Sequence, residues 1–159
     1  MSSADINKYK FINQGGPNVS NHIDDKQNYK TVNEAMRTAN FDQTLIKTIW
    51  NIVACTVHLG NIKFESNEKD LNNNGNDSDE NSPNSNKNIN NQAKIESNSL
   101  KLTKLIAKLL QIDEDELNKA LTSRLIASGS KELVTTFHSI KEALYARDAL
   151  AKVIFRFLI

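Results

Sequence analysis

The chain has 159 residues, of which 38% are hydrophobic and 25% are charged, and its formal net charge is +1. This length fits one domain at most, and the near-zero charge excludes a strongly basic nucleic-acid-binding arm or an acidic tail as the main theme. A single cysteine excludes an intramolecular disulfide framework and favours a reducing compartment. Residues 1–20 show no secretory signal and the apolar runs are too short to span a bilayer, so we expect an intracellular protein.

The first part of the chain predicts two helices after an extended start. Asp24 and Asp25 precede a short helix with apolar residues at three- to four-residue spacing. Asp42 is a typical N-cap for a stronger helix over residues 43–59, and apolar residues cover most of its circumference, which predicts burial. Gly60 suits the C′ position after this helix, where glycine favours a left-handed conformation, and a short strand can follow over 61–64.

A change of composition divides the chain. Residues 65–98 are rich in Asn, Ser, Asp and Glu, and their apolar side chains are few: Leu71, Ile89, Ala93 and Ile95. Such a stretch cannot bury enough surface to offset the entropy of ordering it, so we predict a disordered low-complexity loop. Residues 6–64 and 99–159 carry normal core patterns, which favours one folded unit interrupted by an insert; two separate domains are the alternative.

The second part of the chain predicts three further helices and a hairpin. Residues 124–138 have β-type composition on both sides of a Ser-Gly-Ser turn, which indicates a hairpin with a longer loop. The expected fold class is therefore mainly α with a small β-hairpin. The helix starts are marked by capping residues, namely Ser99, Asp113 with Glu116, and Ser139 with Glu142.

Two patterns resemble metal sites. Asp70, Asn72, Asn74 and Gly75 match the first half of a calcium-binding EF-hand loop, but the twelfth position is Asn81 rather than the required Glu. Asn-rich tracts produce such matches by chance, so we do not predict calcium binding.

Cys55 and His58 have the spacing of half a zinc site, and His22 and His138 are the other histidines. The favoured alternative is a small core cysteine beside a helix-end histidine whose charge would interact favourably with the helix dipole. We assign no catalytic, cofactor-binding or metal-binding residue in this chain.

Four segments follow one another along the chain with distinctive motifs: Tyr9-x-Phe11-Ile12-x-Gln14 with His22-Ile23-Asp24-Asp25 and Ala35-Met36; IVACTVHLGNIKF at 52–64; Leu117 through Ala120-Leu121-Thr122-x-Arg124-x-Ile126; and YARDALAK at 145–152. The occurrence of HLGNI together with RDALAK is the most specific part of this pattern. In this order the segments resemble the myosin motor domain, specifically its upper 50-kDa subdomain, and look most like unconventional class I myosins.

The resemblance implies a partial myosin motor domain over residues 1–159, within a P-loop NTPase-type fold, in an actin-based cytoplasmic motor that uses ATP and Mg²⁺. The P-loop, switch I and switch II of the family are not found in this chain, so it should not hydrolyse ATP alone. Calmodulin-type light chains would bind a neck outside this chain, and neither nucleic acid nor a membrane is an expected partner of this segment. The alternative is a non-catalytic actin-interaction fragment or pseudo-motor.

The resemblance also places an actin-contacting loop at the tip of the hairpin. In the family, this surface loop touches the filament, and the position sixteen residues before the Asp of DALAK carries Thr, Ser, Asp or Glu. In this chain that position is Glu132, which implies a permanent negative charge facing a cationic patch on actin. A solvated loop residue without a special role is the alternative. The expected contact residues are Ser128, Gly129, Ser130, Lys131 and Glu132.

Overall fold

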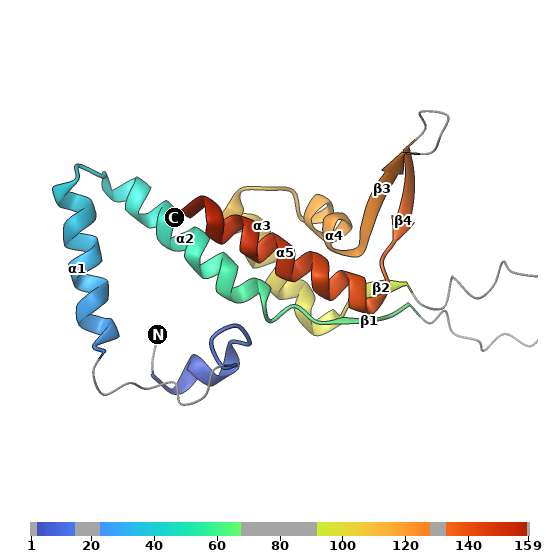
Figure 1. Ribbon diagram of the computed structural model, residues 1–159, viewed down its shortest axis with the longest axis horizontal. Coiled ribbons are helices and arrows are strands. Elements are labelled where there is room, and N and C mark those ends of the chain that lie inside the picture. The colour runs from blue at the N-terminus through green and yellow to red at the C-terminus, as the bar shows by residue number, and fades with distance from the viewer. Residues whose placement is uncertain (1–2, 15–22, 68–91, 128–132, 159) are drawn as a thin grey trace, which may run out of the picture.

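The computed structural model describes residues 3–14, 23–67, 92–127 and 133–158 (Figure 1). Five α-helices and two small antiparallel sheets make up most of these residues, so the expected fold class, mainly α with a small hairpin, is confirmed. None of the described helices combines the length and apolarity needed to cross a membrane.

The elements are the 3-10 helix η1 (Ser3–Lys8), α1 (Asp25–Thr38), α2 (Gln43–Leu59), β1 (Phe64–Ser66), β2 (Ala93–Ile95), the 3-10 helix η3 (Ser97–Ser99), α3 (Leu100–Leu110), α4 (Glu114–Thr122), β3 (Ser123–Ala127), β4 (Leu133–Phe137) and α5 (Ile140–Leu158).

The core lies where α2 packs against both α3 and α5, with α4 closing it from the side of the hairpin (Figure 1). Its buried members come from all four helices and from the turn after α2. Each is at most 4% exposed, and burial of these apolar side chains is the main stabilising contribution to the fold. They are Cys55, Leu59, Ile62, Ile106, Ala107, Leu117, Leu121 and Ala151.

Of the predicted helix starts, those at Asp42 and Asp113 are confirmed, whereas the one at Ser99 is wrong in detail. The carboxylate of Asp42 accepts a hydrogen bond from the Leu45 amide at 2.7 Å, and that of Asp113 accepts from the Glu116 amide at 3.0 Å. Ser99 stands at the N-cap of α3, but its hydroxyl makes no capping bond. The Ser99 hydroxyl instead accepts from the backbone amide of Lys63 at 3.1 Å, so it joins the start of α3 to the segment before β1.

The ends of the range predicted to be a disordered loop are ordered. β1 and β2 pair in antiparallel register, with Phe64 opposite Ile95 and Ser66 opposite Ala93, and η3 follows directly. The physical reason is that two of the few apolar residues of this range lie against the core: Ala93 is only 5% exposed and Ile95 packs on the core cluster. Residues 68–91, which include the EF-hand-like pattern, lie outside the described residues.

Gly60 is required for a reason different from the predicted one. It follows α2 in a right-handed conformation, with φ −57°, rather than the expected left-handed one. A Cβ atom built on Gly60 would lie 2.7 Å from the ring of Phe11. Glycine at this position therefore permits the close approach of the N-terminal segment to the end of α2.

The N-terminal half of α2 is less buried than predicted. Leu45 is 44% exposed although the neighbouring Ile46 is buried, and α1, which stands away from the helical body, packs on this half (Figure 1). The contact between the two helices is made by Trp50, whose indole N–H donates to Asn33 Oδ1 at 3.1 Å and whose ring lies 4.7 Å from that of Tyr29. The predicted burial around most of the helix is confirmed only for the C-terminal half of α2, which α3 and α5 enclose.

Candidate functional site

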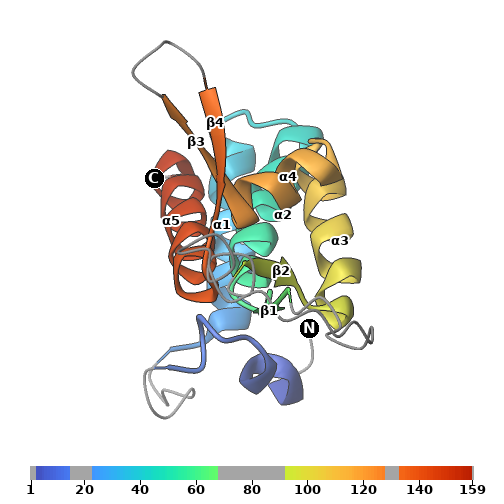
Figure 2. The same ribbon diagram turned by 90° about the vertical axis from the view of Figure 1, so that its right-hand side faces the viewer.

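The hairpin β3–β4 projects from the helical body (Figure 2). Its five paired positions run from Ser123 opposite Phe137 to Ala127 opposite Leu133, which confirms the hairpin predicted over residues 124–138. Ala127 and Leu133, the last paired positions, lie at the end of the hairpin farthest from the Ser123–Phe137 pair. The five expected contact residues, Ser128, Gly129, Ser130, Lys131 and Glu132, form the connection between the strands and lie outside the described residues.

Both faces of the hairpin expose large apolar side chains. Because side chains alternate along a strand, Leu125, Leu133 and Phe137 share one face, and they are 65%, 67% and 53% exposed. Ile126 and Val134 occupy the opposite face at 43% and 50%. Contiguous exposed apolar surface on a soluble domain marks a site of contact with another surface. The hairpin strands therefore offer apolar side chains that a partner surface could cover, as does the end of α5, where Phe157 is 88% exposed.

The base of the hairpin is bonded to two other elements, α4 and β2. The backbone N–H of His138, directly after β4, donates to the carbonyl of Thr122 at the end of α4, at 2.8 Å. The carbonyl of His138 accepts from the backbone N–H of Ala93 in β2, at 2.7 Å. His138 itself is 8% exposed. The end of β4 is thus held at α4 and β2, directly before the start of α5, and the far ends of the strands project from the helical body (Figure 2).

The predicted capping box at the start of α5 is confirmed. Glu142 Oε2 accepts from both the backbone N–H and the hydroxyl of Ser139, at 2.8 and 2.9 Å, and the Glu142 amide donates back to Ser139 Oγ at 3.3 Å. The other oxygen, Glu142 Oε1, lies 3.6 Å from Nη2 of Arg124 on β3. Hydrogen bonds from Ser139, and to a smaller extent the positive charge of Arg124, lower the pKa of the Glu142 carboxyl below 4.5.

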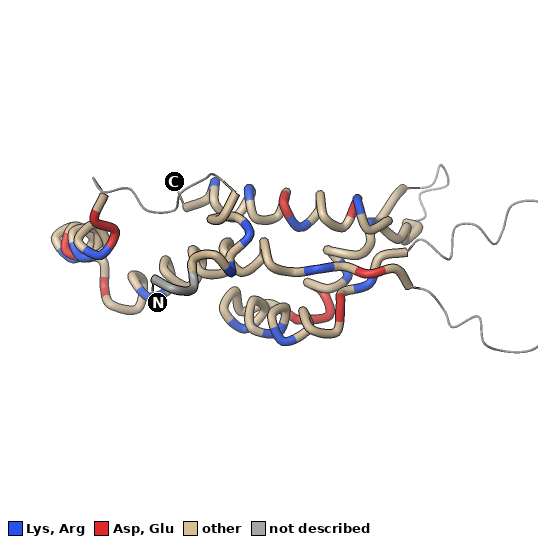
Figure 3. The backbone as a smooth tube through the Cα atoms, turned by 90° about the horizontal axis from the view of Figure 1, so that it is seen from below, with Lys and Arg blue, Asp and Glu red and all other residues tan. Residues whose placement is uncertain are grey.

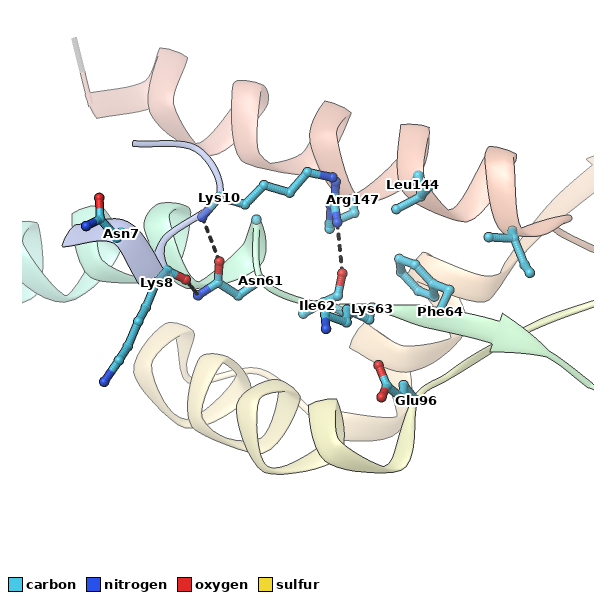
Figure 4. A pocket seen from close by; sticks show the side chains of 12 residues that line it. Asn7, Lys8, Lys10, Asn61, Ile62, Lys63, Phe64, Glu96, Leu144 and Arg147 are labelled. Carbon is cyan, nitrogen blue, oxygen red and sulfur yellow. Dashed lines mark hydrogen bonds between the residues drawn. The ribbon is translucent and has the colours of Figure 1, made fainter. Parts of the chain in front are cut away.

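A buried arginine joins α5 to the end of α2 (Figure 4). Arg147 is 2% exposed; its Nη1 donates to the carbonyl of Ile62 at 2.8 Å and its Nη2 lies 2.7 Å from Asp148 Oδ1. It lines a cavity of about 600 Å³ together with Lys10 and Asn61, whose side-chain Oδ1 accepts from the Lys10 amide at 2.9 Å. With Nη1 bonded to the Ile62 carbonyl and both Nε and Nη2 on Asp148 Oδ1, Arg147 acts as a tie between elements rather than as a free anion-binding group.

The role of Arg147 was not predicted, although the sequence held a signal for it. Ala143 and Ala151 lie one turn to either side on the same face of α5, and both are buried. Small residues four positions before and after an arginine leave room for its side chain to lie along the helix toward the core. That spacing indicates a buried arginine within the YARDALAK segment.

Cys55 and His58 lie in an apolar environment. Cys55 Sγ is 3.9 Å from the carbonyl oxygen of Ile106, and burial raises the pKa of the thiol to about 11. The ring of His58 meets that of Tyr9 edge-on, with centroids 5.5 Å apart, and burial lowers the pKa of His58. Burial therefore favours the neutral imidazole, contrary to the expected charged form at the helix end. Within the described ranges, no three Cys, His, Asp or Glu residues are grouped as a metal would need.

Comparison with known proteins defines the class. The family model of the myosin head (motor domain) matches residues 1–159, so this chain belongs to the myosin motor-domain family.

Among individual proteins, the chain is similar to unconventional myosins. It is 34% identical over 148 residues to unconventional myosin ID of Drosophila melanogaster and 32% identical over 153 residues to unconventional myosin-Ig of Homo sapiens, in each case covering 93% of this chain. Unconventional myosin-Id of Danio rerio is 32% identical over 151 residues, 95% of this chain. These matches confirm the class I-like resemblance. The chain spans only 12–13% of the length of these relatives.

Proposed function

We propose that this chain is the part of an actin-based motor that presents the filament-contacting hairpin β3–β4. The observation that carries the proposal is the projecting hairpin, whose apolar side chains are exposed on both faces in a chain of the myosin motor-domain family. The full-length protein would couple ATP hydrolysis, with Mg²⁺, to movement along actin in the cytoplasm. The P-loop and switches that hold the nucleotide would come from parts of the motor beyond this segment.

The proposed contact combines apolar side chains on the strands with charge at the connection between them. Leu125, Leu133 and Phe137 offer apolar area on one face. Glu132 would add a permanent negative charge directly before β4. Complementary charges at a rim act on the encounter rate and on the salt dependence of binding. The apolar strands would then hold a complex that the charge helps to orient.

Actin-activated ATP turnover of the full-length protein tests this function. We expect Glu132→Gln to raise the actin concentration for half-maximal activation about threefold at low salt, and to reduce its dependence on ionic strength, because one rim charge is lost. Glu34→Gln is the matched control: it removes the same charge from an exposed position on α1, away from the hairpin. Equal activation curves for the wild type and both variants at several ionic strengths would contradict a role for Glu132.

The apolar part of the contact needs a second variant. Leu133→Ser removes the most exposed large side chain of the hairpin strands. We expect it to weaken cosedimentation with actin filaments to a similar extent at low and high salt, because an apolar contact is little screened. Unchanged cosedimentation of both hairpin variants would overturn the proposed filament contact.

A further inference from the structure

One carboxylate, that of Glu142, serves two elements at once. Its Oε2 receives two hydrogen bonds from Ser139 within the capping box of α5. Its Oε1 faces Arg124 of β3, with 3.6 Å between the oxygen and Nη2. Because separate oxygens are used, neither interaction displaces the other.

Arg124 lies at a point that can set the direction of the hairpin. It is the second residue of β3 and is paired with Thr136, the second-last residue of β4. The backbone bonds of His138 hold the end of β4 to α4 and β2, and the Ser123 hydroxyl at the start of β3 donates to the Lys119 carbonyl of α4 at 2.8 Å. The ion pair between Arg124 and Glu142 adds a side-chain contact on the side of α5.

We propose that Glu142 is a positioning residue that fixes the orientation of the hairpin β3–β4 relative to α5. This inference rests on the proposed function, in which the same hairpin meets the filament. An exposed ion pair normally contributes little, because ordering two long side chains opposes the attraction. Here the capping box already orders one partner, so only the Arg124 side chain loses freedom when the pair forms.

The lowered pKa of Glu142 agrees with this geometry, since both Ser139 and Arg124 favour the ionised carboxylate. At neutral pH the group is charged and available to the arginine. Filament contact at the hairpin would therefore be transmitted to α5 as a rigid-body movement rather than absorbed by rotation at the base.

Hydrogen–deuterium exchange of the full-length protein without actin tests the positioning role by itself. Glu142→Gln keeps a side chain that can complete a capping box but removes the charge that attracts Arg124. We expect the paired amides of residues 123–127 and 133–137 to exchange about threefold faster, with the first turn of α5 unchanged. Ser139→Ala is the comparison variant: it removes the capping hydroxyl but keeps the backbone N–H that also holds Glu142, so it should speed exchange in the first turn of α5 and affect the hairpin less than Glu142→Gln does.

A double-mutant cycle identifies the partner. Arg124→Gln should match Glu142→Gln in its effect on hairpin exchange, and the double variant should add nothing, because both changes remove one interaction. Unchanged hairpin exchange in Glu142→Gln would overturn the proposal. Additive effects of the two substitutions would overturn it as well, because they would show that the residues act separately.

Actin activation of the same variants separates this inference from the function on which it rests. We expect Glu142→Gln to raise the half-maximal actin concentration about twofold, with no further change on adding Arg124→Gln. Faster hairpin exchange with unchanged actin activation would support the positioning role and count against the filament contact. Unchanged exchange in a protein whose actin activation still depends on Glu132 would overturn the positioning role and leave the proposed function intact.

Discussion

The helical core and the hairpin contain similar apolar residues but expose them very differently. In the core, Leu59, Ile62 and Ile106 are fully buried, whereas Leu125 and Leu133 of the hairpin are 65% and 67% exposed. The helices carry many charged residues, with only lysines on α3 and three acidic residues in the first turn of α4, whereas the two hairpin strands carry one, Arg124 (Figure 3). The difference shows that the apolar residues of the core stabilise the fold, while those of the hairpin are available for contact with another surface.

Truncation of a core side chain is the largest change that this comparison predicts. Ile106→Ala should reduce the free energy of unfolding by about 2–5 kcal/mol, because a fully buried side chain is lost and a cavity remains. Leu133→Ala, in the hairpin, should change it by less than about 0.5 kcal/mol. Urea unfolding of the two variants measures both values. Similar losses for the two would mean that the hairpin is also part of the folding core.

A charged residue inside the core gives a second way to test the contrast. Arg147→Ala should lower the free energy of unfolding by about 2–3 kcal/mol, because the Ile62 carbonyl loses its buried donor and a cavity forms. This destabilisation is smaller than the one caused by breaking a fully buried ion pair, since the Asp148 side chain is 39% exposed and water can solvate its carboxylate. Arg147→Met should restore the part of the unfolding free energy that Arg147→Ala loses through the cavity, because the methionine side chain fills that space.

Arg156→Ala is the matched control for Arg147 because it removes the same charge from an exposed position on the same helix. Thermal unfolding should separate the two by several degrees, with Arg156→Ala close to the wild type. Equal melting temperatures for Arg147→Ala and Arg156→Ala would contradict the assigned role of Arg147 as a tie between α5 and the end of α2.

The features that could be predicted from the sequence are those set by neighbouring residues. The cap at Asp42, the cap at Asp113 and the box of Ser139 with Glu142 each depend on residues three positions apart, and each is present in the structure. The hairpin strands follow equally from a local run of β-type residues on each side of a turn.

The features that were missed depend on contacts between distant residues. β1 and β2 pair across an insert of polar residues, and Ser99 bonds to Lys63. The close approach of Phe11 to Gly60 and the contact of Arg147 with Ile62 also join separate segments. Composition and periodicity carry no information on which segments meet. The same holds for the candidate site. Its two strands could be predicted from neighbouring residues, but the ion pair between Glu142 and Arg124 joins residues eighteen positions apart and is seen only in the structure.

Among the core substitutions, the smallest loss of stability is predicted at the edge of the core, where Phe11 covers Gly60. Gly60→Ala should lower the free energy of unfolding by about 1–2 kcal/mol, because the new methyl group would lie 2.7 Å from the Phe11 ring and the ring must shift. In a Phe11→Leu background the same substitution should be neutral or slightly stabilising, since the right-handed backbone of Gly60 suits alanine. A double-mutant cycle from urea unfolding measures the coupling between the two positions. An equal cost of Gly60→Ala in both backgrounds would place the strain in the backbone rather than in the contact with Phe11.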